Sequence, residues 1–144
     1  MEITGITALI RLGVSLLLGA AIGAERAIHH HPAGVRTFTL ICLGSTLATL
    51  ASIYICQTNT DLLNGDPGRI AAQVLTGIGF IGAGLIIKNE DGVSGLTTAS
   101  CIFVSAAVGI AVGVGMLLPA AVVTAVTVII LASSFLKKKR KDSR

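Results

Sequence analysis

Three glycines in the stretch TGIGFIGAGLII, residues 76–87, have the spacing G-x-G-x-x-G that is typical of dinucleotide-binding loops. In those loops the glycines follow a strand and open a helix whose N-terminus holds a pyrophosphate. Here the apolar residues around Gly77, Gly79 and Gly82 continue a run that starts near Pro67, which indicates the later part of one helix. The acidic residue expected about 20 positions further on is also missing. The spacing therefore does not predict nucleotide binding.

The same glycines fit a membrane helix that other helices approach closely. At about 100° per residue, Gly77 and Gly84 share one face, while Gly79, Gly82 and Ala83 share roughly the opposite face. Small residues mark helix interfaces in lipid, where association depends on close packing. We therefore expect this third helix to be central. The same G-x-x-x-G device, facing either this chain or a partner subunit, is present in two other pairs: Gly19 with Gly23, and Gly109 with Gly113.

Charged residues near the outer ends of the apolar segments form the first polar candidate. Arg11 lies about 8 Å inside its segment at 1.5 Å per residue, and a charge at that depth needs a partner. Asp66 is the first choice and Glu2 the second, unless Arg11 snorkels and Asp66 only caps a helix that has Pro67 at its first position. The predicted outer polar cluster, structural or functional, comprises Arg11, Asp66, Arg69 and Gln73.

A second polar cluster is expected at the inner ends of the segments, where the alternative is ordinary charge anchoring at the membrane surface. Lys88 lies near it, and the cluster itself comprises Glu25, Arg26, Arg36, Thr37, Thr97 and Thr98. The consecutive histidines 29–31 splay over about 200° of a helix, so they indicate a solvated loop rather than a metal site.

The remaining reactive side chains predict no catalytic site. Cys42, Cys56 and Cys101 are odd in number and contain no C-x-x-C, which favours a packing role for them. No nucleophile stands at a meaningful spacing from a base, and no H-E-x-x-H motif is present. We therefore expect neither an enzyme nor a bound cofactor, and the sequence does not identify a metal ligand set.

The composition indicates a protein that is embedded in a lipid bilayer. Of its 144 residues, 53% are hydrophobic and 12% are charged, whereas soluble domains carry about 25% charged residues. The net charge of +4 comes from residues 137–144, which hold six of the 11 basic and one of the seven acidic residues. With one Tyr, no Trp and no basic face, the chain offers nothing for nucleic acid to bind.

Apolar runs of nearly 20 residues predict an all-α integral membrane protein, a compact bundle of about five transmembrane helices. The N-terminus has no cleavable signal pattern, so the first run is expected to be retained. The positive-inside rule places the N-terminus outside and the C-terminus inside, with residues 1–136 as the membrane domain and 137–144 as a basic cytoplasmic tail. The expected spans are 6–24, 36–55, 69–87, 96–113 and 116–136.

Four ordered motifs between about Arg11 and Gly115 resemble the MgtC/SapB family of bacterial inner-membrane proteins. They are GAER at 23–26, PAGVRT at 32–37, DPGRIAAQVLTGIGFIGAGLI at 66–86 and GLTTAS at 95–100. The resemblance implies a five-helix, multi-pass domain linked to growth in scarce magnesium and to virulence. It also implies regulation of other membrane proteins, including the F-type ATP synthase. Many members add a soluble ACT-like C-terminal domain, whereas this sequence ends at KKKRKDSR.

Two functions follow from these residues. The first is a non-enzymatic membrane protein that regulates or binds partners within the bilayer, since the helices offer small-residue faces and the chain little soluble mass. The alternative is a small transporter or channel for magnesium or another cation, since polar groups stand at both ends of a glycine-rich core. We expect a homodimer, because five helices are few for a transport pathway.

Overall fold

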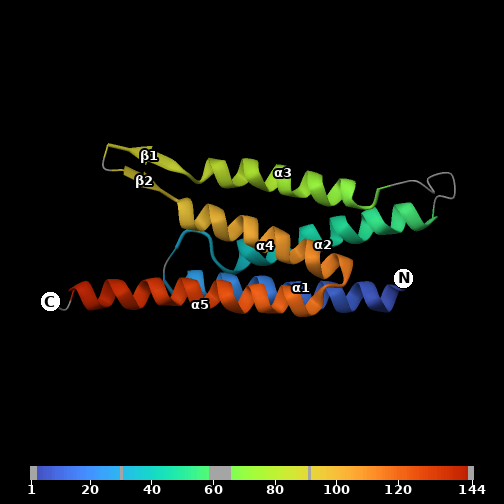
Figure 1. Cartoon of the computed structure of the whole chain (residues 1–144), viewed down its shortest axis with the longest axis horizontal. Helices are drawn as coiled ribbons and strands as arrows, with labels where there is room; N and C mark the ends of the chain where they lie inside the picture. Colours follow the sequence, from blue (N-terminus) through green and yellow to red (C-terminus); the bar gives the residue numbers. More distant parts are fainter. Residues whose placement is uncertain (1–2, 30, 59–65, 91, 143–144) are drawn as a thin grey trace.

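The computed structural model describes residues 3–29, 31–58, 66–90 and 92–142, with side chains as far as residue 133. A two-stranded antiparallel hairpin follows the third helix. The helices alternate in direction, so α1 begins and α5 ends at opposite ends of the bundle (Figure 1). The elements are α1 (Gly5–Ile28), α2 (Val35–Thr58), α3 (Gly68–Gly84), β1 (Ile87–Asn89), β2 (Gly92–Ser94), α4 (Leu96–Val114) and α5 (Leu117–Asp142).

The predicted bundle of five helices is confirmed as a set of helices. Within the part of the chain whose side chains are described, three of them are long and apolar enough to cross a membrane. These three are α1, α2 and α4. Helix α5 runs from Leu117 to Asp142, and Leu117–Ser133 is its apolar part within the residues whose side chains are described. Helix α3 has 17 residues, or about 25 Å at 1.5 Å per residue, against a hydrocarbon layer of roughly 30 Å. The five-span count and the orientation stay predictions.

Two glycines of α1 bring that helix into backbone contact with the start of α2. A Cβ atom at Gly19 would lie 2.9 Å from the carbonyl oxygen of Phe38, and one at Gly23 would lie 2.5 Å from the Cα of Val35. Real Cβ atoms do not approach other atoms this closely, so any side chain here would push the helices apart. The first G-x-x-x-G pair therefore packs within the chain.

Helix α4 approaches α2 in the same way from another side. A Cβ at Gly109 would overlap the carbonyl oxygen of Cys42, and one at Gly113 would lie 2.6 Å from the Cβ of Thr49. The close approach also lets the Thr46 hydroxyl donate a hydrogen bond of 2.8 Å to the Gly109 carbonyl. Helices α1, α2 and α4 thus form a unit, which we call the three-helix unit, held together at its glycines.

The prediction that the third helix is central is wrong. Helix α3 lies at the edge of the bundle, where it packs on α2 and α4 (Figure 1). Its buried residues are Ile78 and Gly82. At Gly77 and Gly84 a Cβ would meet no atom of the described residues within 4 Å. The face with Gly82 therefore packs inside the chain, while the face with Gly77 and Gly84 is open. Helical periodicity alone does not tell which of the two faces is buried.

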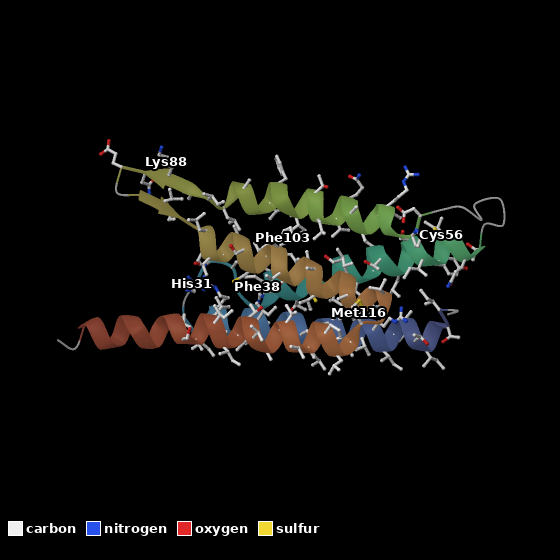
Figure 2. All side chains as sticks on the ribbon, viewed as in Figure 1. His31, Phe38, Cys56, Lys88, Phe103 and Met116 are labelled. Carbon is white, nitrogen blue, oxygen red and sulfur yellow. The ribbon has the colours of Figure 1, made fainter. Side chains whose placement is uncertain are left out.

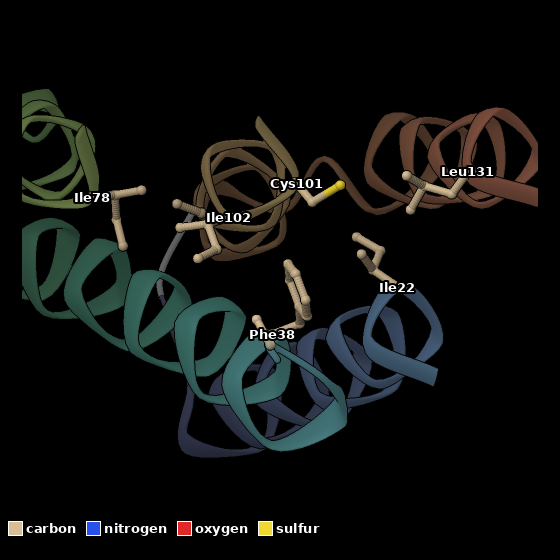
Figure 3. Close-up of a cluster of buried hydrophobic side chains, with 8 residues drawn as sticks. Ile22, Phe38, Ile78, Cys101, Ile102 and Leu131 are labelled. Atoms are coloured by element: carbon tan, nitrogen blue, oxygen red, sulfur yellow. The ribbon is translucent and has the colours of Figure 1, made fainter. Parts of the chain in front are cut away.

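The hydrophobic core lies where α1, α2 and α4 meet. Ile22, Phe38 and Ile102 are fully or almost fully buried there, and one side chain from each of the three helices points into the cluster (Figure 3). Ile78 of α3 and Leu131 of α5 join the cluster from its two sides. The outer helices are therefore fixed by apolar contacts to the three-helix unit.

Two glycines in left-handed conformation shape the turns at the ends of α4. Gly115 has a φ of +99° and caps α4, so α5 can begin two residues later, as the predicted short break requires. Gly95 has a φ of +86°, and a Cβ there would overlap the Leu85 carbonyl oxygen. The hairpin folds back over this contact, so α3 ends at Gly84 rather than at the predicted Ile87.

The glycine contacts of α2 predict a position-dependent cost of added methyl groups. Gly109→Ala should lower the free energy of unfolding by about 1–3 kcal/mol, because the methyl group would collide with the Cys42 carbonyl. Gly44→Ala is the matched control on α2, since its Cβ would meet no described atom within 4 Å, and it should raise stability by up to about 1 kcal/mol. Unfolding in mixed detergent micelles measures both. Equal effects would contradict the packing.

Candidate functional site

Arg11 lies against the C-terminal turn of α4. Its side chain is 5% exposed, and its Nη1 donates a hydrogen bond of 2.7 Å to the carbonyl oxygen of Gly113. A Cβ at Gly115 would lie 2.8 Å from Nη2, so the glycine leaves room for the guanidinium. The last carbonyls of a helix lack internal partners and carry partial negative charge, which suits an arginine.

The outer polar cluster is therefore divided, and the prediction that one cluster holds all four residues needs correction. Asp66, Arg69 and Gln73 line a pocket of about 540 Å³ between the end of α2 and the start of α3, while Arg11 is not among its lining residues. Ser52 and Cys56 of α2 form its other wall. The sequence favours an acidic partner for Arg11 because side-chain charges can be read from it. Which backbone carbonyls are free at the end of a helix cannot be read from it.

Asp66 caps the start of α3, as predicted, but the helix begins one residue later than expected. Helix α3 starts at Gly68 rather than Pro67, and the Asp66 Oδ1 accepts a hydrogen bond of 2.8 Å from the Gly68 amide. Ser52 on α2 donates a bond of 2.7 Å to the Pro67 carbonyl. The start of α3 is thus tied both to its own cap and to α2.

At the opposite end of the bundle, three residues of the predicted inner polar cluster lie close together, and His29 joins them. Arg26 Nη2 donates a hydrogen bond of 3.1 Å to Thr98 Oγ1, and both side chains are buried. Glu25 Oε1 lies 3.3 Å from His29 Nε2, one helical turn further on. The His29 contact is absent from the sequence prediction, although the spacing of Glu25 and His29 by four residues would have revealed it.

Two buried atoms of this inner group lack partners among the described residues. They are Oε2 of Glu25 and Nε of Arg26. The other predicted members are more accessible: Thr37 is half-buried, while Arg36 and Thr97 are exposed. The structure thus brings Glu25, Arg26 and Thr98 to one place and leaves the other three predicted residues at its surface. His30 lies outside the described residues.

The two polar groups face opposite ends of the bundle and offer no shared metal site. Within the described residues, no group of three or more His, Cys, Asp or Glu side chains is placed to hold a metal ion. The three cysteines are free thiols, and Cys42 and Cys101 are buried, which is the placement expected for packing residues.

A groove of about 420 Å³ runs between α3 and α4 on the outside of the bundle. Helix α3 contributes Gly79 and Gly82, and α4 contributes Ala99 and the half-exposed ring of Phe103 (Figure 2). The missing Cβ atoms deepen the groove, since one added at Gly79 would meet no described atom within 4 Å and one at Gly82 would reach Ala99 at 3.7 Å. The residues that line the groove are mostly apolar.

Comparison with known proteins relates the chain to one family. The sequence model of the MgtC family matches residues 12–139. The protein named "Putative magnesium transporter YhiD" of Escherichia coli is 46% identical over 110 residues, which cover 75% of this chain and 51% of that protein. "Protein MgtC" of Salmonella typhimurium is 40% identical over 131 residues, 91% of this chain and 52% of that protein.

A third relative, "Protein MgtC" of Brucella abortus, is 44% identical over 115 residues, 78% of this chain and 45% of that protein. The chain therefore spans about half the length of the curated relatives it matches. No solved structure matches the chain significantly.

The buried bond between Arg26 and Thr98 predicts a measurable loss of stability. Thr98→Val keeps the shape of the side chain but removes the acceptor of the guanidinium, so it should lower the free energy of unfolding by about 1–3 kcal/mol. The neighbouring Thr97 is exposed, and Thr97→Val should change it by less than about 0.5 kcal/mol. Thermal unfolding in detergent distinguishes the two. A neutral Thr98→Val would mean that the bond does not hold α1 to α4.

Proposed function

The chain belongs to the MgtC family, and we propose that it is a non-enzymatic, magnesium-related protein of the bacterial inner membrane that acts by binding other membrane proteins. Three apolar helices of membrane-spanning length and the family match support the membrane location. The name of the Escherichia coli relative supports the link to magnesium. In this proposal all five helices lie in the bilayer, with the N-terminus outside and the basic tail, residues 137–144, at cytoplasmic headgroups.

The observation that carries the proposal is the position of two hollows, both of which lie beside α3. In the three-helix unit, the glycines allow the helices to pack with their backbones in contact. The packed backbones then occupy the space that a central pathway would need. Both the pocket at the start of α3 and the groove between α3 and α4 adjoin the edge helix instead. Recognition at the edge of a packed bundle fits a protein that docks on a partner better than one that conducts an ion.

The groove between α3 and α4 is suited to one transmembrane helix of a partner protein. Gly79, Gly82 and Ala83 allow a second helix to approach α3 closely, and such approach is what drives helix association in lipid. The Phe103 side chain on the opposite wall provides apolar contact area. A membrane protein such as the F-type ATP synthase offers helices of this kind, and the partner's identity is left to experiment.

Filling the groove should abolish function without unfolding the protein. Gly79→Leu replaces a glycine at which a Cβ would meet no described atom within 4 Å, so the chain should still fold. The new side chain would occupy the groove between α3 and α4. A host lacking its own copy of the gene should regain growth in low magnesium with the unaltered chain and fail to regain it with the variant, because the new side chain keeps the partner helix from close approach.

Gly44→Leu is the matched control, because Gly44 is likewise exposed and free of contacts within 4 Å among the described residues but lies on α2. It should support growth like the unaltered chain. Growth that is equal with both variants would remove the groove from the function. Failure of the unaltered chain to support growth would overturn the link to magnesium.

A transporter for magnesium or another cation is the second candidate, and the pocket at the start of α3 favours it. The Asp66 carboxylate supplies the oxygen ligands that magnesium prefers. Arg69 lines the same pocket and opposes a cation there, and Glu25 lies near the end of α1, which is at the other end of the bundle (Figure 1). We therefore rank transport below partner binding.

Magnesium flux into liposomes separates the two candidates. The docking proposal expects vesicles with the purified, folded chain to load magnesium no faster than empty vesicles, and Asp66→Asn to change nothing. Flux that depends on the protein and is lost in Asp66→Asn would replace docking by transport and would make the Asp66 pocket its mouth.

A further inference from the structure

We propose that the outward face of α3 is the surface on which a second copy of this chain docks, with the two α3 helices parallel. The outward face comprises Gln73, Gly77, Phe80 and Gly84, all of which are exposed. At about 100° per residue these four residues fall within about 60° of one another, and the buried contacts of Ile78 and Gly82 are centred about 150° away. The face thus points away from the buried contacts of α3, and at Gln73 it borders the pocket whose other wall is α2.

The shape of this face is complementary to itself. Phe80 is 83% exposed, while Gly77 and Gly84, two turns apart, carry no side chain and have open space beside them, because a Cβ at either would meet no described atom within 4 Å. Copies inserted in one orientation are related by a two-fold axis along the membrane normal, which brings unlike sides of the two faces together. Phe80 and Gly77 lie on opposite sides of the centre of the face, so each ring can extend toward the glycine side of the other copy's face.

The polar group on the face also selects a second copy over lipid. Gln73 lies about 8 Å inside α3 at 1.5 Å per residue, and its exposed amide would be costly against hydrocarbon. An amide both donates and accepts hydrogen bonds, and Gln73 lies near the centre of the face, so two symmetry-related amides satisfy each other. Acyl chains provide no such partner.

Charge at the start of α3 adds to this complementarity. Asp66 and Arg69 are both exposed and carry opposite charges within one helical turn. In a parallel pair the two helix starts lie at the same depth, so each copy presents a carboxylate and a guanidinium to the other. The opposite signs suit a copy of the same chain, in which attraction arises twice by symmetry.

This surface differs from the groove between α3 and α4, so one α3 can hold a second copy and a partner helix together. The proposal rests on the insertion of α3 into the bilayer that the proposed function includes, and it does not rest on partner docking in the groove. Failure of Gly79→Leu to affect growth would leave it intact.

Energy transfer between donor-labelled and acceptor-labelled copies of the full chain in lipid vesicles tests the proposal. Transfer should persist when the protein is diluted with lipid, and Gly77→Leu or Gly84→Leu should weaken association at least about tenfold, because the new side chain keeps the two α3 backbones apart. Gly79→Leu and Gly13→Leu are matched controls that should associate normally, since both glycines are exposed and without contacts within 4 Å among the described residues but lie off the face.

Disulfide cross-linking is a second readout, and it tests the contact between the two copies without weakening it. Gly84→Cys, in a chain whose native cysteines are replaced by alanine, should form a disulfide-linked dimer on oxidation, whereas Gly79→Cys should not. Transfer that vanishes on dilution of the unaltered chain would overturn the proposal. So would leucine variants that keep their helical circular dichroism and associate like the unaltered chain, or equal cross-linking at the two cysteine positions.

Discussion

The contact of α2 with the backbones of α1 and α4 is the constraint on which the rest of the structure depends. In lipid there is no hydrophobic drive between helices, so the chain relies on approach distances that only glycine permits. At Gly23 and Gly109 the neighbouring backbone lies where a side chain would be. That approach places Gly113 and Thr98 where arginines of α1 can reach them, and these two buried hydrogen bonds hold α1 to α4 at opposite ends.

Because the three-helix unit is complete without it, α3 can serve another purpose. It is fixed by the buried residues Ile78 and Gly82, by the partly buried Val74 and Leu75 that pack against the core, by the Asp66 cap and by the bond from Ser52. Its other residues include several that are exposed. Its four later glycines thus differ in surroundings: Gly82 is buried against Ala99 in the groove, Gly79 is an exposed residue of the same groove, and Gly77 and Gly84 lie on the outward face. A helix that lies at the edge of the bundle and has several faces open to close approach is suited to contacts between proteins.

Much of this fold is predictable from sequence, because apolar runs and turn residues fix the number and order of helices. The division of roles among glycines is not, since Gly82 and Gly77 look alike until the position of α3 is known. The hairpin is missed because the apolar Ile86 and Ile87 suit a helix and a strand equally. The acceptor of Arg11 is missed because a free carbonyl at a helix end belongs to the fold and not to any residue type.

Photo-crosslinking from each position of α3 in native membranes tests the central claim most directly, that this edge helix presents different surfaces for different contacts. Our account predicts adducts with a second copy from Gly77 and Gly84, and adducts with another membrane protein from Gly79 and Ala83. Positions 78 and 82 should react within the chain. Adducts with lipid alone from every exposed position would contradict the account and would leave α3 as a structural helix.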